Sequence, residues 1–290
     1  MTAAAEVRSR ASRFLRPVGL IVGFYLITLI TLGVLQALVS QLRLASADTQ
    51  DIFVGWVSLA SVLLATWIML RLVERLPWSV VGLDRSAASP PLLIKGAAFG
   101  GLTIGIASLG LLATHFLRIV PTVPGSWWGE AGRSTAALLP AAIFEEMFFR
   151  GYAFAVLRRA AGWRAALIVT SVVFGFLHAW NPGADAESLL AVIVAGFFLG
   201  AILLYTRSLY AAGAAHFAWN WIMAGALHIA VSGIPARDPD YKIIETGPDW
   251  LTGGRWGPEG GAAAVVAMFI VVFYLYGRHQ RRGEWNWAKA

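Results

Sequence analysis

Eight long apolar stretches dominate this chain of 290 residues and limit the folds that are open to it. A helix that crosses a membrane needs about 20 predominantly apolar residues. The stretches lie at 17–40, 52–73, 93–117, 135–157, 163–181, 187–205, 208–232 and 260–277. Too little sequence remains between them for a soluble domain. We therefore predict an all-α polytopic membrane protein with about eight transmembrane helices. Residues 1–290 form one membrane domain, which includes a basic N-terminal tail at 1–16.

The lysines and arginines are distributed unevenly between alternate loops. With a cytoplasmic N-terminus, the cytoplasmic segments hold 16 of the 23 and the opposite segments hold 6. Cytoplasmic loops of membrane proteins carry such an excess. We therefore expect an integral, multi-pass protein with both termini cytoplasmic. Topology alone accounts for the net charge of +7. The basic cytoplasmic face also favours anionic membrane lipid, and no nucleic-acid partner is expected.

The fourth stretch contains ionisable residues that membrane helices normally exclude. Glu145, Glu146 and Arg150 all lie within it. A charged side chain at the bilayer centre costs roughly 2.5–3.5 kcal/mol even on a lenient insertion scale. Positions four apart share a helix face, so Glu146 can pair with Arg150. Glu145 is five residues from Arg150, about 140° around the helix, and needs a different partner.

Polar side chains on two other stretches are candidates for that partner. His178 lies four residues after Phe174 in the fifth stretch, and His216 and Asn220 share one face of the seventh. A carboxylate and an imidazole can together activate a water molecule. A second imidazole and an amide N–H can donate to a developing oxyanion. This combination suits hydrolysis of an amide bond.

The same side chains leave the use of a metal open. Glu145, His178 and His216 also form a ligand set for one divalent metal such as zinc, which would activate a bound water. The chain has no cysteine, no H-E-x-x-H and no G-x-S-x-G. These absences argue against a thiol nucleophile, a zincin and a serine hydrolase. A glutamate-activated water without any cofactor and a single bound metal both remain.

The polar motifs resemble those of the CPBP family, which contains CAAX proteases and bacteriocin-processing enzymes and is also called the Abi family. Its members carry E-E-x-x-x-R, F-x-x-x-H and H-x-x-x-N on three separate spans. The corresponding motifs here are Glu145-Glu146-x-x-x-Arg150, Phe174-x-x-x-His178 and His216-x-x-x-Asn220. The resemblance covers residues 134–221, which we call the motif region.

The resemblance implies an intramembrane endopeptidase with its active site among helices four, five and seven. In family terms, Glu145 and His178 activate the water, and His216 and Asn220 stabilise the oxyanion. Glu146 and Arg150 support the site, together with Phe174. Members of the family have been described both as metalloproteases and as enzymes that use a glutamate-activated water.

The resemblance implies less about the substrate. Ras-converting members remove the last three residues from prenylated C-terminal CAAX sequences, and others act on different substrates or serve as partners of sensor proteins. We expect a protein or peptide substrate, of CAAX type or with another membrane-associated C-terminus. Two alternatives stay open: a proton-coupled transporter with the glutamates and histidines as a relay, and a non-catalytic partner of another membrane protein.

Two further patterns concern packing and loops. Six glycines follow the small-xxx-small spacing that lets helix backbones approach closely, and we assign them to packing: Gly96, Gly100, Gly101, Gly105, Gly196 and Gly200. The loop at 233–259 contains four prolines. We expect it to be an irregular connector rather than a lid over the site.

Overall fold

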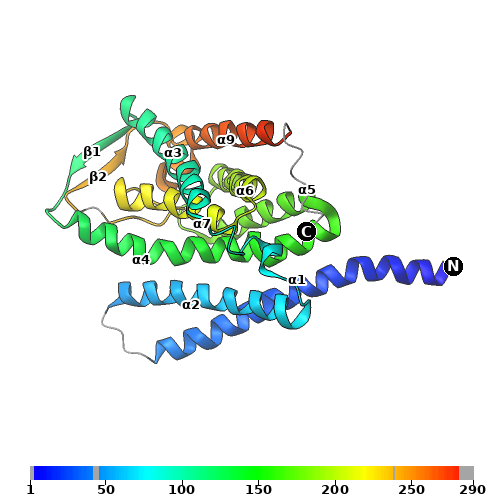
Figure 1. The fold of residues 1–290 in the computed structure, drawn as a ribbon. Helices are drawn as coiled ribbons and strands as arrows, with labels where there is room; N and C mark the ends of the chain where they lie inside the picture. The colour runs from blue at the N-terminus through cyan, green and yellow to red at the C-terminus, as the bar shows by residue number, and fades with distance from the viewer. Residues whose placement is uncertain (1–2, 42–45, 238, 281–290) are drawn as a thin grey trace.

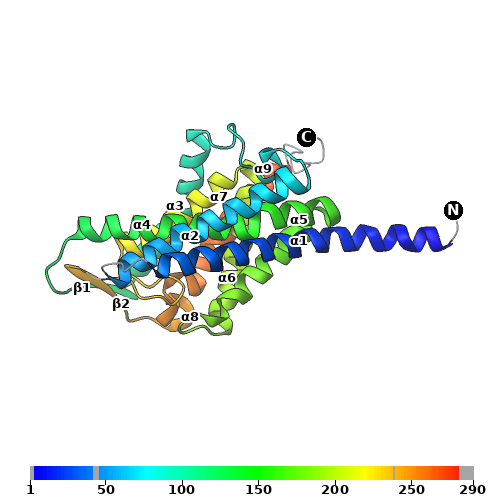
Figure 2. The ribbon, with the colours of Figure 1, turned by 90° about the horizontal axis from the view of Figure 1, so that it is seen from below.

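The computed structural model describes residues 3–41, 46–237 and 239–280, and most of these are helical (Figure 1). The long helices are α1 (Ala3–Ser40), α2 (Ala47–Trp67), α3 (Pro90–Ala113), α4 (Trp127–Glu146), α5 (Tyr152–Leu177), α6 (Ala186–Thr206), α7 (Leu209–Trp221) and α9 (Ala262–Gln280). Each predicted span has a counterpart among them. Figure 2 shows α1 and α2 side by side on the outside of the bundle, where α2 packs on α4.

Five helical segments are long and apolar enough to cross a membrane: Leu15–Ser40, Thr49–Val73, Pro90–Ala113, Trp127–Trp180 and Ala186–Thr206. The outward faces of these helices expose large apolar side chains, for example Ile30 at 64% and Ile106 at 65%. Such surfaces suit contact with lipid, because soluble proteins rarely expose large contiguous apolar patches. The chain is an integral membrane protein of the predicted all-α class.

The segment Trp127–Trp180 is 54 residues long and contains two of the predicted spans. It joins α4, the π-helix η3 (Met147–Gly151), α5 and the 3-10 turn η4 (His178–Trp180). The backbone leaves the helical region at Gly162, where φ is 84°. Glycine adopts this conformation without a Cβ clash. The green ribbon in Figure 1 turns back there, so the segment makes two passes.

Two other expectations need adjustment. The predicted seventh span ends earlier than expected, because α7 is followed only by the π-helix η5 (Ile222–Ala226). The predicted N-terminal tail is part of α1, whose backbone is helical from Ala3. Four residues of the charge count lie outside the described residues: Arg43, Arg281, Arg282 and Lys289.

Two short strands were not predicted. β1 (Leu117–Pro121) and β2 (Tyr241–Glu245) pair antiparallel, with Leu117 opposite Glu245. The expectation that 233–259 is irregular is therefore wrong for β2, and also for the short turns α8 (Asp249–Thr252), η6 (Gly254–Trp256) and η7 (Pro258–Gly260). Because the paired strands are far apart in sequence, no local pattern reveals the pairing. Figure 1 shows the strands at the end of the bundle where α4 begins.

Glycines bring α3 and α7 into backbone contact. A β-carbon added at Gly96 would overlap the carbonyl oxygen of Ala211, and one added at Gly100 would overlap that of Ala215. At Gly105, no atom lies within 4 Å of the added carbon. The packing interpretation is confirmed for the first two positions. This contact fixes the position of α7, which carries two residues of the motif region.

Close packing also positions the end of α5 against α6. A β-carbon at Gly196 would lie 2.8 Å from the Cα of Ser171. On the opposing helix, a β-carbon at Gly175 would lie 3.1 Å from the backbone nitrogen of Ile193. Neither position accepts a side chain without movement of the other helix. These contacts therefore fix the position of the last turn of α5, and of η4 after it, along the axis of α6.

Candidate active site

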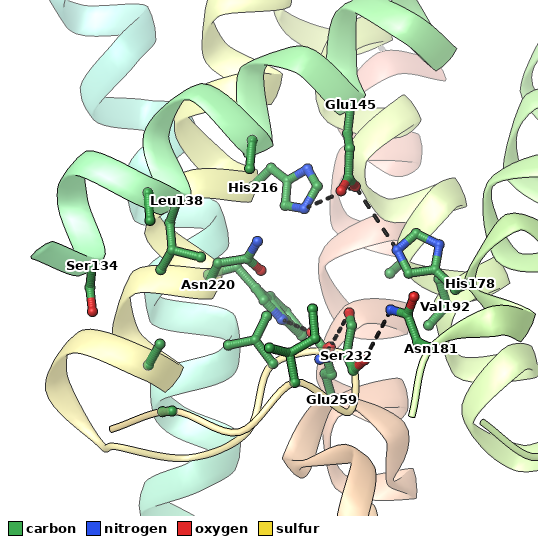
Figure 3. A pocket seen from close by; sticks show the side chains of 18 of the residues that line it. Ser134, Leu138, Glu145, His178, Asn181, Val192, His216, Asn220, Ser232 and Glu259 are labelled. Carbon is green, nitrogen blue, oxygen red and sulfur yellow. Dashed lines mark hydrogen bonds and ion pairs between the residues drawn. The ribbon is translucent and has the colours of Figure 1, made fainter. Parts of the chain in front are cut away.

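One cavity within the bundle collects side chains from all three motifs. Glu145 of α4, His178 of η4, and His216 and Asn220 of α7 line it, together with Phe174 of α5 (Figure 3). These residues come from the predicted helices four, five and seven. Figure 3 shows Glu145 projecting from its helix between the two imidazole rings, with Asn220 beside His216.

Glu145 lies at ion-pair distance from both histidines but forms a hydrogen bond with neither. Its Oε2 atom is 4.0 Å from Nε2 of His178 and 3.8 Å from Nε2 of His216. Both distances exceed that of a hydrogen bond. Among the described residues, this buried Oε2 has no hydrogen-bond partner. Buried carboxylate oxygens are rarely left in this state in proteins, and each such case needs an explanation.

A backbone hydrogen bond determines which ring nitrogen of His178 carries the proton. Its Nδ1 atom lies 2.7 Å from the carbonyl oxygen of Phe174. A carbonyl oxygen only accepts, so Nδ1 carries the proton and donates it. In the neutral ring, Nε2 is then an acceptor, and it is this atom that faces Glu145. The F-x-x-x-H spacing produces this bond because residues four apart meet on a helix.

His216 is held by the second carboxylate of the motif. Its Nδ1 atom lies 3.0 Å from Oε1 of Glu146, and Nη1 of Arg150 donates to the same oxygen at 3.0 Å. The predicted pairing of Glu146 with Arg150 is therefore present. The sequence did not predict the bond to His216, because the two residues lie on different helices. Since Nδ1 donates to Glu146, Nε2 of His216 can donate only when the ring is an imidazolium.

Phe174 connects these charged groups through its ring. The guanidinium carbon of Arg150 lies 4.1 Å from the ring centroid of Phe174, within the range of a cation–π contact. The His178 ring lies 4.6 Å from the same centroid, and the His216 ring 6.2 Å. Arg150 also lies in a π-helical turn, a feature frequent at functional sites. The ring of Phe174 thus packs against all three side chains.

Polar residues on the far side of the cavity were missed by the sequence analysis. Glu259 accepts hydrogen bonds from Trp219 Nε1 at 2.8 Å, from the Ser232 backbone at 2.6 Å and from the Ser232 hydroxyl at 2.7 Å. Asn181 donates to the carbonyl oxygen of Ser232 at 3.0 Å. These bonds hold residues 231–236, which we call the roof segment, over the cavity.

The roof segment begins outside the predicted loop and extends into it. Its last residues and Glu259 line the cavity, so the loop at 233–259 is more than the plain connector that we expected. The sequence offers little signal for this role. Glu259 is a single acidic residue beside a proline and two glycines, a composition typical of any loop.

The outer end of the cavity carries a charged pair. Arg133 and Glu130 lie in the first turns of α4 and form a salt bridge, in which Arg133 Nε donates to Glu130 at 2.8 Å. The Ser134 hydroxyl donates to the same carboxylate at 3.2 Å. The sequence analysis did not single out these residues, because an i,i+3 pair near a helix end is common on protein surfaces.

The three candidate metal ligands do not form a metal site in this arrangement. Zinc at about 2.0–2.2 Å from each tetrahedral ligand places ligand atoms about 3.3–3.6 Å apart. The distances from Glu145 to the two Nε2 atoms are 4.0 and 3.8 Å, both longer. Within residues 3–41, 46–237 and 239–280, no group of three or more His, Asp or Glu side chains has an arrangement suited to a metal ion.

Among known proteins, one family model matches a segment that contains the motif region. The family model of the type II CAAX prenyl endopeptidase Rce1-like proteins matches residues 126–222, about a third of the chain. No match was found among curated proteins or among solved structures. The matched segment contains α4, α5, α6 and α7 and with them every motif residue. The match agrees with the resemblance drawn from the motifs: over this segment the chain is similar to the Rce1-like CAAX proteases.

Proposed function

We propose that this protein is an intramembrane endopeptidase that hydrolyses a peptide bond with a water activated by Glu145 and His178. The observation that supports this most strongly is the buried Oε2 of Glu145, which has no partner among the described residues and lies near two ring nitrogens. A water bound to Oε2 at hydrogen-bond distance would also lie within reach of the unprotonated Nε2 of His178. Both groups can then accept a proton from it.

The reaction follows from the protonation states of these groups. Glu145 takes one proton from the water as its oxygen attacks the carbonyl carbon, and His178 orients the water through Nε2. The protonated Glu145 then donates to the leaving nitrogen as the C–N bond breaks. A positioned general base of this kind contributes about 10²–10⁴-fold to the rate. The second proton of the water stays on the new carboxylic acid, which then passes it to the amine, so the products are a carboxylate and an ammonium group.

His216 and Asn220 would stabilise the tetrahedral intermediate. The amide of Asn220 has N–H donors, and Nε2 of His216 donates when the ring is an imidazolium. Glu146 supports that state, because its carboxylate accepts the Nδ1 proton and lies next to the ring. Loss of one oxyanion donor lowers the rate of other hydrolases by about 10²–10³. Arg150 in turn keeps Glu146 in place and ionised.

The walls of the cavity suit an extended peptide with apolar side chains. Between the charged pair at the outer end and Glu145, the lining is apolar: Ala137, Leu138, Ala141, Val192, Ala195 and Leu199. Apolar surfaces with a few polar groups are typical of ligand sites. We propose a peptide or protein substrate with a membrane-associated segment, of which a CAAX-type C-terminus is one example.

The test is cleavage of a peptide library by purified protein in detergent. The library contains membrane-protein-derived and prenylated CAAX peptides. Wild type is compared with Glu145→Gln, which keeps the shape of the side chain but cannot accept a proton, and with Glu187→Gln, an exposed carboxylate outside the cavity. We expect cleavage by wild type and Glu187→Gln only. Undiminished cleavage by Glu145→Gln would refute the proposal.

A chelator arm addresses the use of a metal in the same assay. Cleavage that persists with a chelator agrees with a glutamate-activated water, and cleavage that stops would call for a metal-dependent step. Absence of cleavage by all three proteins, with a retained biological effect of Glu145→Gln, would favour the non-catalytic partner.

A further inference from the structure

The cavity extends from the middle of the bundle toward one end only. Its lining residues on α4 run from Glu130 to Glu145, and none follows Glu145. On α7 they begin at His216 and continue toward Ala224. The remaining lining residues come from the middle of α6 between Val192 and Leu199, from the end of α5 and the turn after it, from the roof segment and from Glu259. From Glu145 the cavity thus extends toward the start of α4, and Figure 1 shows β1 and β2 at that end of the bundle.

The opposite end of the bundle is closed by packed side chains. Beyond Glu146, one apolar cluster includes Met147, Phe154, Leu203 and Leu209, each at most 2% exposed. Close packing of this kind leaves few voids larger than a water molecule. A peptide therefore has no route to Glu145 from that end.

Contacts between loops hold that closed end together. Arg159 forms a salt bridge with Glu74 at 2.8 Å, and the Tyr152 hydroxyl donates to the same carboxylate at 2.5 Å. The backbone nitrogen of Leu209 donates to the carbonyl oxygen of Gly82 at 3.0 Å. The loop at 74–89, the Gly162 turn and the start of α7 thus lie on one side. None of these segments lines the cavity.

The charges of the two ends differ strongly. At the closed end, including the start of α1, lie thirteen of the described Lys and Arg residues. At the end with the cavity lie five: Arg118, Arg133, Arg237, Lys242 and Arg255. Arg150 lies inside the bundle and belongs to neither end. By the positive-inside rule, the closed end faces the cytoplasm.

We propose that the active-site cavity opens on the extracytoplasmic side of the membrane, so that the substrates are peptide segments presented at that face. The proposal deepens the proposed function and rests on it for the reaction, but the side of opening depends only on the fold and the charges. A C-terminus anchored in the cytoplasmic leaflet would have to cross the packed cluster to reach Glu145. A CAAX-type C-terminus in that leaflet, named above as one example of a substrate, is therefore excluded. Secreted peptides and outward-facing ends of membrane helices have no such barrier.

The side of the opening is measurable without knowledge of the substrate. Because the chain has no cysteine, single-cysteine variants can be labelled at one defined site. Ala236→Cys lies in the roof segment, Lys242→Cys lies on β2, and Ser86→Cys lies in the loop at the closed end as the matched control. Spheroplasts of an expressing bacterium are treated with a membrane-impermeant maleimide before and after lysis.

We expect Ala236→Cys and Lys242→Cys to be labelled equally before and after lysis, and Ser86→Cys only after it. The reverse pattern, or equal labelling of all three before lysis, would overturn the proposal. A cleavage arm adds the peptide library to intact spheroplasts that express wild type or Glu145→Gln. Glu145-dependent cleavage before lysis is expected, and cleavage only after lysis would also overturn it. Absence of cleavage in both states would count against the proposed function, while the labelling still decides the side.

Discussion

The contact between α3 and α7 leads to a sharp prediction for Gly100→Ala. The added methyl carbon would lie 2.6 Å from the carbonyl carbon of Ala215 and 2.8 Å from its Cα. Carbon atoms in contact are normally about 3.5–4.0 Å apart. The two helices must therefore separate locally by about 1 Å, since both close atoms belong to the backbone and cannot rotate away.

Two effects should follow from this separation. Extra methylene groups in a well-packed interior cost about 1–3 kcal/mol of folding free energy. His216 directly follows Ala215 on α7, so it would move relative to Glu145. A misplacement of about 1 Å in an active site can lower the rate about 10²-fold. We expect Gly100→Ala to lower both the melting temperature and the rate of peptide cleavage.

Gly105→Ala is the matched control, because it makes the same substitution about 1.4 turns further along the same helix. No atom lies within 4 Å of a β-carbon there. Alanine in a helix is favoured over glycine by roughly 0.5–1 kcal/mol, so this variant should be as stable as wild type or more so. Both are measured by thermal unfolding in detergent and by cleavage of one peptide. If Gly100→Ala matches Gly105→Ala in both, the reasoning from backbone contact is wrong.

Three further predictions concern charged side chains. Arg150→Met should destabilise the protein by about 3–5 kcal/mol, because it leaves the Glu146 carboxylate buried without its cation. Adding Glu146→Gln should restore part of the melting temperature, and an unchanged melting temperature in Arg150→Met would contradict the pairing. Glu259→Ala should free the roof segment and raise KM more than it lowers kcat; unchanged KM would show that the roof does not hold substrate. Burial, together with the nearby carboxylate of Asp249, raises the pKa of Glu245 to about 7 from 4.5. The folded state then binds this proton more tightly than the unfolded state, so wild-type stability falls as the pH rises through this range. Glu245→Gln should remove this contribution to the pH dependence, so the melting-temperature difference between wild type and variant should change between about pH 5 and about pH 8. The same difference at both pH values would contradict the raised pKa of Glu245.

The chemistry of the site was predictable because it depends on short-range helix geometry. Glu146 and Arg150 pair at i,i+4, and His178 bonds to the carbonyl of Phe174 at the same spacing. An ionisable residue in an apolar stretch is also conspicuous in any sequence. Such features require no knowledge of how the helices are arranged.

Contacts between helices could not be predicted in this way. The bond from His216 to Glu146 joins two helices whose rotation and depth are set by backbone contacts such as that at Gly100. The roof segment and the strand pair depend on loops that meet only in the folded protein. Glu259 is therefore visible as a functional candidate only when its hydrogen bonds to Trp219 and Ser232 are known.

The separation of Glu146 and His216 along the chain also has a consequence for biosynthesis. These residues are 70 positions apart, so at about 5–20 residues per second the second emerges several seconds after the first. During that interval α4 must enter the bilayer without α7. Glu146 and Arg150 are synthesised about one turn apart, and their salt bridge makes the pair electrically neutral before α7 arrives. Arg150 thus neutralises Glu146 while α4 inserts into the bilayer. His216, whose imidazole completes the site, is synthesised only afterwards.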